Sequence, residues 1–518
     1  MKKILCALLI VLLLPVNVVY PLALEDLSVT INDFTNGAGK VIETFSGDSI
    51  VTTSVTASAP STDNAIVVVT AIYKGTELIN INLNHTTVST YATTEIKNTY
   101  DISKIPEATS IKVMVWDKDS ISDIVSPKTL VRQDVRDLVF GALQSSSDHY
   151  ESNINAGMNT VLFELHWNSF YVSDGQKNTS YINRRKEELE NIKSLGYKVM
   201  LGLGTQYTPS WIYNYENSRF VNQYGDSYTT TEVGDTAVNA VFNNAMRDKL
   251  EEYMADVAQE FGNDFDIVRL GLMRYGELGY PNQSFNGKTN SYWAFDDIAQ
   301  GKKSGLPEGL DVCPVPGWIP GSPSPNGEAY SFANWYMDSL LNYQNWQIDT
   351  CDKYFDSEMA VLYPSWGMRT GQLEQAIAGN LSASTSAEKN GEVQRGFDFE
   401  RLVMAIDNPD VIVYCTWIDA NPEWTNNDDQ TVPSESNNFS PVHYLAYYAK
   451  KNPLKLKVMG ENTGGGNLSN MTLCFERMKK YDIDGIMWAF EKDLYDNTAP
   501  TLSNYASYIA DYIEFANK

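Results

Sequence analysis

The fold of the longer part of this chain is decided by the stretch Ile267-Val268-Arg269-Leu270-Gly271-Leu272-Met273. A short apolar run of this kind is typical of a buried β-strand. Upstream of it, apolar side chains recur at helical spacing; they are Phe242, Met246, Leu250, Met254, Val257 and Phe261. The sequence therefore predicts a helix followed by a buried strand.

The same alternation of buried strand and amphipathic helix runs through residues 135–518. We predict eight strands, at 138–143, 161–166, 198–204, 267–273, 359–364, 411–417, 455–460 and 485–490. Another helical face is formed by Phe332, Tyr336, Leu340 and Tyr343, and Gly196 is expected to close the helix before the third strand. Eight such units predict a (β/α)₈ (TIM) barrel. The alternative is a doubly wound open sheet, but no GxGxxG or GxxxxGK[ST] motif opens a turn after a strand.

Residues 25–130 have a different pattern and predict a small all-β sandwich that precedes the barrel. Strand-like runs at 49–55, 66–73 and 111–116 are separated by segments rich in Ser, Thr, Asn and Asp. Such a domain binds carbohydrate or acts as a spacer. Because no strong aromatic platform is present, the sequence favours the spacer role.

The N-terminus has the features of a secretory signal peptide spanning residues 1–23. Lys2 and Lys3 precede an apolar run from Ile4 to Leu14, and Ala23 is a candidate cleavage site. The alternative is an uncleaved membrane anchor, because the apolar character continues weakly to Leu24. No later segment is apolar enough to span a bilayer. We therefore expect a secreted, extracellular protein with no membrane span in the mature chain.

Composition excludes several classes of partner and cofactor. The formal net charge is -26, and an acidic surface repels the phosphates of nucleic acids. The mature chain has four cysteines, at positions 313, 351, 415 and 474, but no CxxC pair, and the whole sequence has 4 histidines. A structural zinc site is therefore not expected, although the sequence allows one disulfide. Cys415 lies in a predicted strand and is interpreted as a small buried side chain.

Three glutamates stand at or just after predicted strands, where barrel enzymes place their catalytic groups. They are Glu164, Glu277 and Glu461. The fourth and seventh strands lie on opposite walls of a barrel, so Glu277 and Glu461 are expected to face each other. Glycoside cleavage needs one carboxylic acid to protonate the leaving oxygen and one carboxylate to attack or to activate water. A single Glu after a strand is more often a helix-capping or surface residue, so the hypothesis rests on the pair.

Aromatic and polar residues near the strand ends complete the expected saccharide site. Sugar rings stack on aromatic faces, although core packing is the alternative for each ring. The long segment 280–329 after the fourth strand is expected to shape the mouth of the site. The expected substrate-binding residues are Glu164, Trp167, Trp211, Tyr280, Trp366, Thr416, Trp417, Asp419, Asn462 and Trp488.

The segments around Glu277 and Glu461 resemble motifs of a known family. The pattern Gly271-Leu272…Gly276-Glu277-Leu278…Tyr280-Pro281 is similar to the general-acid motif of β-amylases, glycoside hydrolase family 14, and Gly460-Glu461-Asn462 resembles their general-base motif. Glu164, followed by Trp167, matches the position of an Asp on that family's second strand. The resemblance spans about residues 136–516, includes the helix at 332–341, and implies an inverting hydrolase that needs no cofactor.

The chain departs from that family in its substrate contacts. The family's His after strand three is replaced here by Gly204 or Thr205, its mobile loop is missing, and its Lys and His after strand five have no counterpart. The catalytic pair is thus implied more firmly than starch as substrate. Family 42 β-galactosidases, which are retaining, are the alternative, although Gly276 stands where they have Asn. A catalytically inactive carbohydrate-binding barrel, and a cell-surface scaffold that acts through its β-sandwich, are the non-enzymatic hypotheses.

Overall fold

The structure is a computed structural model, and it divides the chain into two compact units, residues 1–135 and 136–518. It describes residues 27–516 except 43, 46–48, 60, 75–76, 106–107, 109, 119, 122, 133–135, 230–236, 383–386 and 423–436. The predicted signal peptide lies outside the described residues. Within the described ranges, no helix is long and apolar enough to cross a membrane.

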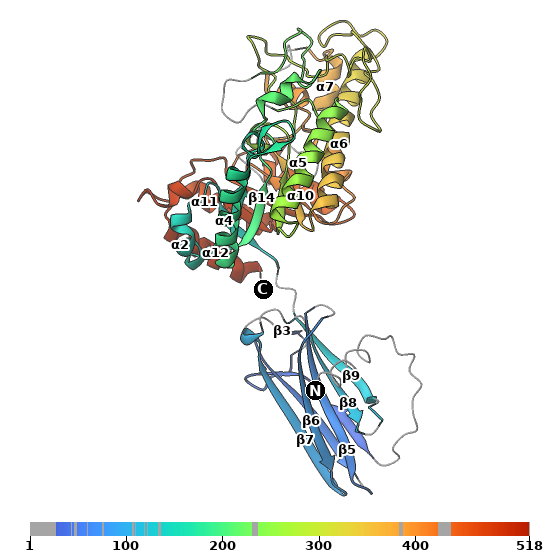
Figure 1. The fold of residues 1–518 in the computed structure, drawn as a ribbon, viewed down its shortest axis with the longest axis vertical. Helices are drawn as coiled ribbons and strands as arrows, with labels where there is room; N and C mark the ends of the chain where they lie inside the picture. The colour runs from blue at the N-terminus through green and yellow to red at the C-terminus, as the bar shows by residue number, and fades with distance from the viewer. Residues whose placement is uncertain are drawn as a thin grey trace. The chain divides into compact units, whose positions relative to one another are not determined.

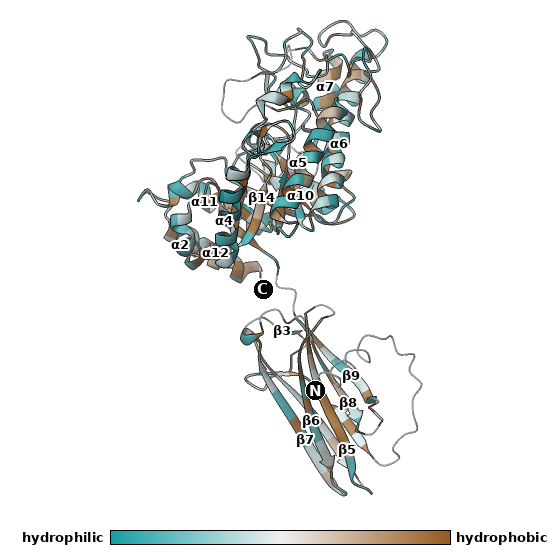
Figure 2. Cartoon of the chain, in the orientation of Figure 1, coloured by the Kyte–Doolittle hydropathy of each residue, from teal (hydrophilic) through white to brown (hydrophobic). Residues whose placement is uncertain are grey.

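The first unit is all-β, as predicted, and consists of two sheets. One sheet pairs β4 with β1, β2 and β7; the other has the order β3-β9-β8-β5-β6. The strands are β1 (Ser28–Ile31), β2 (Thr35–Asn36), β3 (Thr44–Phe45), β4 (Ile50–Ala59), β5 (Asn64–Lys74), β6 (Glu77–Val88), β7 (Ala92–Asp101), β8 (Ser110–Asp117) and β9 (Asp123–Arg132). Buried side chains from both sheets, among them Val51, Val55, Val68 and Val113, form one apolar core. In Figure 2, β5 is among the more hydrophobic strands of this unit.

The second unit is a closed barrel of eight parallel strands, which confirms the predicted fold class (Figure 1). Neighbours in the barrel follow the order of the sequence, and the last strand pairs with the first. The strands are β10 (Val139–Ala142), β11 (Thr160–Glu164), β14 (Lys198–Gly202), β15 (Ile267–Leu270), β16 (Glu358–Tyr363), β17 (Val411–Cys415), β18 (Lys457–Glu461) and β19 (Gly485–Trp488). All eight predicted strands are present at the predicted places.

Helices surround the barrel, and the predicted helical faces are buried against it. The helices are α2 (Tyr150–Asn155), α3 (Trp167–Phe170), α4 (Thr179–Ser194), α5 (Asn244–Phe261), α6 (Glu328–Tyr354), α7 (Gln372–Ala378), α8 (Ala387–Arg395), α9 (Phe399–Met404), α10 (Pro441–Lys451), α11 (Leu468–Tyr481) and α12 (Leu502–Ala516). A small hairpin, β12 (Tyr171–Ser173) and β13 (Gln176–Lys177), follows α3. The Asn243 side chain caps α5, and Gly196 follows α4 with a positive φ, as expected for a helix end. Much of the α4 ribbon has the colour of hydrophilic residues in Figure 2.

The barrel interior is apolar toward the N-terminal ends of the strands and polar toward their C-terminal ends. Met200, Ile267, Ile412 and Met459 belong to the apolar cluster inside the barrel. Side chains two residues apart on a strand point the same way, so the next inward positions are 202, 269, 414 and 461. The alternation of side chains along each strand therefore places Arg269, Tyr414 and Glu461 in one layer inside the barrel, at the C-terminal ends of the strands.

Cys313, Cys351, Cys415 and Cys474 carry free thiols, and all are buried. The disulfide that the sequence allowed is thus not formed in this structure. Cys415 lies in β17 with no exposed surface, as expected for a small core side chain.

Candidate active site

Glu277 is presented by a tight loop directly after β15. The backbone N–H groups of Leu272 and Met273 both donate to the carbonyl oxygen of Glu277, at 3.0 and 2.8 Å. The chain reverses through Tyr275 and Gly276, which have φ values of 61° and 75°. A Cβ atom at Gly271 would lie 1.7 Å from the Gly276 carbonyl oxygen, so this return requires glycine at 271.

Glu461 is the last residue of β18 and is held by two side chains from other barrel strands, Tyr414 on β17 and Arg269 on β15. The Tyr414 hydroxyl donates to Oε2 of Glu461 at 2.6 Å, and Nη2 of Arg269 lies 3.4 Å from the same oxygen. Oε1 of Glu461 accepts no hydrogen bond from the residues that the structure describes. The strands pack closely here, because a Cβ atom at Gly460 would lie 2.1 Å from the Cys415 carbonyl oxygen. One carboxylate oxygen is thus fixed, and the other is available to a ligand.

Arg269 is a cation that interacts with all three predicted glutamates. Its buried guanidinium interacts electrostatically with Glu461, Glu164 and Glu277, and it lies 5.3 Å from the centre of the Tyr414 ring. The carboxylates come from β11, from β18 and from the loop after β15, so they converge at one end of the barrel. This convergence is the arrangement that the sequence predicted for a catalytic pair.

The two central carboxyl groups have shifted pKa values. Burial raises the pKa of Glu277 to about 7, and the Glu461 carboxylate adds to the rise, whereas the cations of Arg395 and Arg269 oppose it. Burial also raises the pKa of Glu461, but Arg269 and the Tyr414 hydrogen bond counteract that effect. Glu277 is therefore the group suited to hold a proton near neutral pH, and Glu461 is the group whose ionised form is supported.

Glu164 borders a small cavity beside this pair. Nε2 of Gln206 donates to its Oε1 at 3.2 Å, and an Arg185 guanidinium nitrogen donates to its backbone carbonyl oxygen at 2.8 Å. The cavity is lined by Arg269 and Tyr275 as well, and its volume of about 20 Å³ is enough for one water molecule. Glu164 thus belongs to the site and lies where it can contact a hydroxyl group.

Three of the five predicted tryptophans, Trp211, Trp366 and Trp417, remain partly exposed, and the last two follow barrel strands. Trp366 follows β16 and Trp417 follows β17, and their rings meet edge to face with centroids 4.9 Å apart. Nε1 of Trp366 donates to the Asn421 carbonyl oxygen at 2.9 Å, which fixes its ring. Both rings thus keep exposed surface beyond the ends of their strands.

Three predicted aromatic contacts are wrong, because the side chains have no exposed surface. Trp167, Trp488 and Tyr280 are each 0% exposed and pack in the layer between the barrel and its helices. Strand parity explains Trp488, since Met487 points into the barrel and the next residue must point outward. The Tyr280 hydroxyl donates to the Tyr336 carbonyl oxygen inside that layer.

Trp211 packs edge to face against Trp167 and Tyr171, with its indole N–H buried. It is therefore mainly a packing residue.

The predicted polar contacts also differ in what their side chains do in the structure. Thr416 is buried, and its hydroxyl lowers the pKa of Glu277, although its geometry does not amount to a full hydrogen bond. Asp419 and Asn462 are buried and tie loops together instead. Asp419 accepts from the Thr463 backbone N–H at 2.8 Å, and Asn462 exchanges two hydrogen bonds with the Ala489 backbone. Their observed role is to hold the loops around Glu461 in place.

Sequence reasoning missed Arg269, Tyr414, Gln206 and Arg395. Arg269 carried a signal that could have been used, because it is a charged residue within an otherwise apolar strand. Arg395 ends α8, and its carbonyl oxygen accepts from the Tyr280 backbone N–H at 3.0 Å, which places it beside the Glu277 loop. Nothing in the local sequence predicted that contact.

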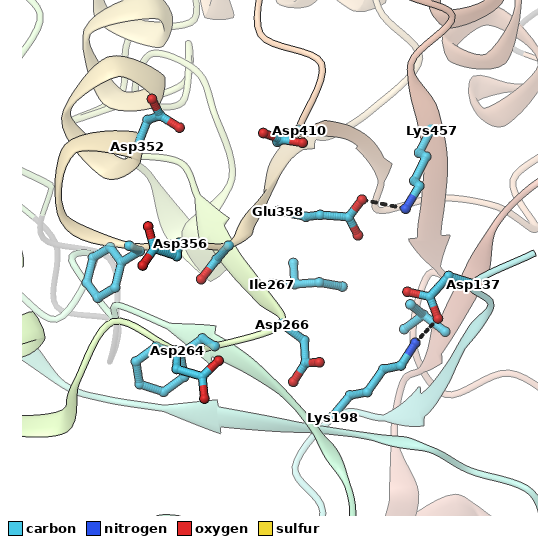
Figure 3. A pocket seen from close by; sticks show the side chains of 14 residues that line it. Asp137, Lys198, Asp264, Asp266, Ile267, Asp352, Asp356, Glu358, Asp410 and Lys457 are labelled. Carbon is cyan, nitrogen blue, oxygen red and sulfur yellow. Dashed lines mark hydrogen bonds and ion pairs between the residues drawn. The ribbon is translucent and has the colours of Figure 1, made fainter. Parts of the chain in front are cut away.

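A much larger cavity lies elsewhere, at the N-terminal ends of the barrel strands. Its volume is about 600 Å³, and it is lined mainly by aspartates and by the ion pairs Lys198–Asp137 and Lys457–Glu358 (Figure 3). Residues at this end of a barrel generally contribute to stability rather than to catalysis. Size alone therefore does not identify the active site here.

Comparisons with known proteins agree with this architecture. No protein-family model matches the chain, and no curated protein matches its sequence. Among solved structures, the catalytic domain of a β-amylase from Paenibacillus polymyxa is similar, with a TM-score of 0.52 and 16% identity over 72% of this chain and 97% of that one. A glycoside hydrolase family 5 enzyme from Prevotella bryantii gives a TM-score of 0.33 and 11% identity, covering 72% of this chain and 87% of its own. At these identities the likeness to the β-amylase domain establishes a shared (β/α)₈ fold.

Proposed function

We propose that this protein is a secreted glycoside hydrolase that cleaves O-glycosidic bonds of an oligo- or polysaccharide with Glu277 and Glu461. The observation that carries the proposal is the meeting of these two carboxyl groups, and of Glu164, around Arg269 at the C-terminal end of the barrel. Active sites of (β/α)₈ enzymes lie at that end.

The environments of the two glutamates suit opposite roles. Glu277, with a pKa of about 7, holds the proton that passes to the leaving glycosidic oxygen. Glu461 has one oxygen fixed by Tyr414 and Arg269, so its other oxygen attacks the anomeric carbon or removes a proton from an attacking water. Glu164, Trp366 and Trp417 then bind the sugar through hydroxyl contacts and ring stacking.

Two further observations support the proposal. The N-terminal Lys2-Lys3 pair and the apolar run after it favour export, the compartment in which polysaccharides are met. The fold is shared with a β-amylase catalytic domain. Starch is not proposed as the substrate, since the sugar-contacting residues of the resembled family are mostly absent.

The test uses the full chain and three variants, Glu277→Gln, Glu461→Gln and the control Glu187→Gln, whose side chain is exposed on α4. Aryl glycosides and oligosaccharides are screened, and circular dichroism verifies folding. We expect each active-site variant to lose at least about 10²–10⁴-fold in turnover, and the control to keep it. Full activity in either active-site variant would overturn the proposal.

The same assay separates the remaining alternatives. The anomeric configuration of the first product, followed by NMR, distinguishes an inverting β-amylase-like enzyme from a retaining family 42-like one. Saccharide binding without turnover by the wild-type chain would instead identify a non-catalytic binding barrel.

A further inference from the structure

Arg395 occupies a fixed position at the edge of the proposed active site. Its backbone carbonyl oxygen is bonded to the Tyr280 N–H, three residues after Glu277. Its guanidinium carbon lies 4.5 Å from the centre of the fully buried Phe397 ring, an arrangement that stacks the planar group and limits its motion. The guanidinium is close enough to Glu277 to be the strongest charge acting on that carboxyl group.

The Arg395 guanidinium lies within ion-pair distance of no carboxylate that the structure describes. Within the part of the chain that the structure describes, Arg395 forms no ion pair, and its buried Nε has no hydrogen-bond partner. Other arginines differ: Arg269 faces Glu461, and Arg401 lies 3.0 Å from Asp338. A partly buried cation without a partner is costly, and such groups are normally paired.

In mildly acidic solution the neighbouring carboxyl group, Glu277, supplies little negative charge. Glu277 has a pKa of about 7, so it is mostly neutral in mildly acidic solution. The site therefore keeps a positive charge beside the general acid, in a chain whose formal net charge is -26. Charges beyond roughly 8–10 Å are screened at ordinary salt, so a ligand responds to the charges of the site itself. Among these, Arg269 is paired with Glu461, whereas Arg395 is unpaired among the residues that the structure describes.

We propose that Arg395 binds an anionic substituent of the sugar, so that the enzyme acts on an acidic saccharide bearing a carboxylate or a sulfate group. The inference rests on the proposed function and names the substrate class of the same site. A guanidinium presents two parallel N–H groups that match the two oxygens of a carboxylate or sulfate, whereas a hydroxyl group offers a single uncharged oxygen. The bound anion supplies the counter-charge that the protein does not.

The kinetic test compares matched 4-nitrophenyl glycosides. Glucuronides and galacturonides of both anomeric configurations are set against the corresponding glucosides and galactosides, with 6-sulfated glycosides as a separate arm. We expect at least a tenfold higher kcat/KM for one anionic series, and the arm that responds tells carboxylate from sulfate. Assays at pH 5.5 keep Glu277 protonated in every variant.

Arg395→Gln is expected to abolish that preference by raising KM for the anionic glycoside, so that the ratio of anionic to neutral kcat/KM falls to about one. Arg395→Lys keeps the charge but not the paired donors, and is expected to retain part of the preference. Equal losses on both series would show that Arg395 only shapes the site, and the absence of any preference in the wild type would overturn the proposal.

A binding arm separates this proposal from the proposed function. Calorimetry with oligogalacturonide and with a neutral malto-oligosaccharide is run on wild type and Arg395→Gln. If no glycoside is hydrolysed, the hydrolase assignment fails, yet tighter binding of the acidic oligosaccharide that is lost in Arg395→Gln still supports the role of Arg395. Equal binding of both oligosaccharides contradicts it.

Discussion

The Tyr414 hydroxyl donates a 2.6 Å hydrogen bond to Oε2 of Glu461, the same oxygen that faces Arg269. Tyr414 lies on β17, Arg269 on β15 and Glu461 on β18, and all three occupy inward positions one step above the apolar interior. Because alternate side chains along a strand point the same way, these three residues meet inside the barrel, where Tyr414 and Arg269 fix the Glu461 carboxylate. A carboxylate held in this way has a defined direction of attack, which is what displacement at an anomeric carbon requires.

Tyr414→Phe removes the donor and leaves the ring. Because hydrogen bonding favours the ionised form of Glu461, its loss is expected to raise the pKa of that carboxyl group further. We expect kcat/KM to fall about tenfold to a hundredfold, since a hydrogen bond to a charged group is worth about 1.5–3 kcal/mol. The acidic limb of the pH–rate profile should move to higher pH. An unchanged acidic limb would mean that Glu461 is not the group that must be ionised.

The pH dependence of activity follows from Glu277. A general acid works only while it keeps its proton, so kcat/KM is expected to decline as pH rises through about 7. Because the Arg395 cation opposes the rise in this pKa, Arg395→Gln should shift the basic limb to still higher pH. Steady-state rates with a neutral aryl glycoside from pH 4 to 9 test both statements. If the basic limb of the profile does not move in Arg395→Gln, Glu277 is not the general acid.

The same shift affects stability. The folded-state pKa of Glu277 exceeds its ordinary value of 4.5, so its contribution to stability is complete below pH 4.5 and is lost as pH rises through about 7. Glu277→Gln has no proton to lose. It is expected to be more stable than wild type at pH 8 by roughly 1–3 kcal/mol, and by much less at pH 4.5. Denaturant melts of the variant and of Glu187→Gln at both pH values measure this, and equal melts at pH 8 contradict it.

The strands and helices of the barrel could be predicted because each carries its own periodic signal. The apolar run at 267–273 and the face that includes Met246 and Leu250 need no knowledge of distant residues. Glu277 and Glu461 could be located for a similar reason, since a barrel collects whatever follows its strands at one end.

The inward or outward direction of each side chain could not be predicted in the same way. Parallel barrel strands are apolar on both faces, so the sequence does not fix which alternate positions point inward. Trp488 was therefore expected to contact sugar although it faces the helices, and Tyr414, which faces Glu461, was not among the expected site residues. Arg395 meets the Glu277 loop only through the path of a long connection between β16 and β17, which local patterns do not encode.

Trp366 and Trp417 are expected to bind sugar rings at the mouth. Replacing either by Ala should raise KM about tenfold with little change in kcat, because stacking holds substrate and transition state alike. Phe515→Ala, at an exposed position near the end of α12, is the control and should change neither constant. A tenfold fall in kcat at constant KM would show that the tryptophans act on the chemical step instead.

Lys457→Ala addresses the large acidic cavity at the opposite end of the barrel. Lys457 begins β18 and pairs with Glu358 at the start of β16, with the two side chains 40% and 26% exposed. Such partly exposed pairs contribute about 0–1 kcal/mol, so a small loss in the free energy of unfolding is expected. Turnover should stay within about twofold of wild type, because Glu461 lies at the other end of the same strand, four residues away, which is about 13 Å at 3.3 Å per residue. Urea melts and steady-state assays of the same preparation provide both readouts. If the variant melted like wild type but lost most of its activity, the catalytic centre would have to be sought at the N-terminal end of the barrel, and the assignment of Glu277 and Glu461 would be wrong.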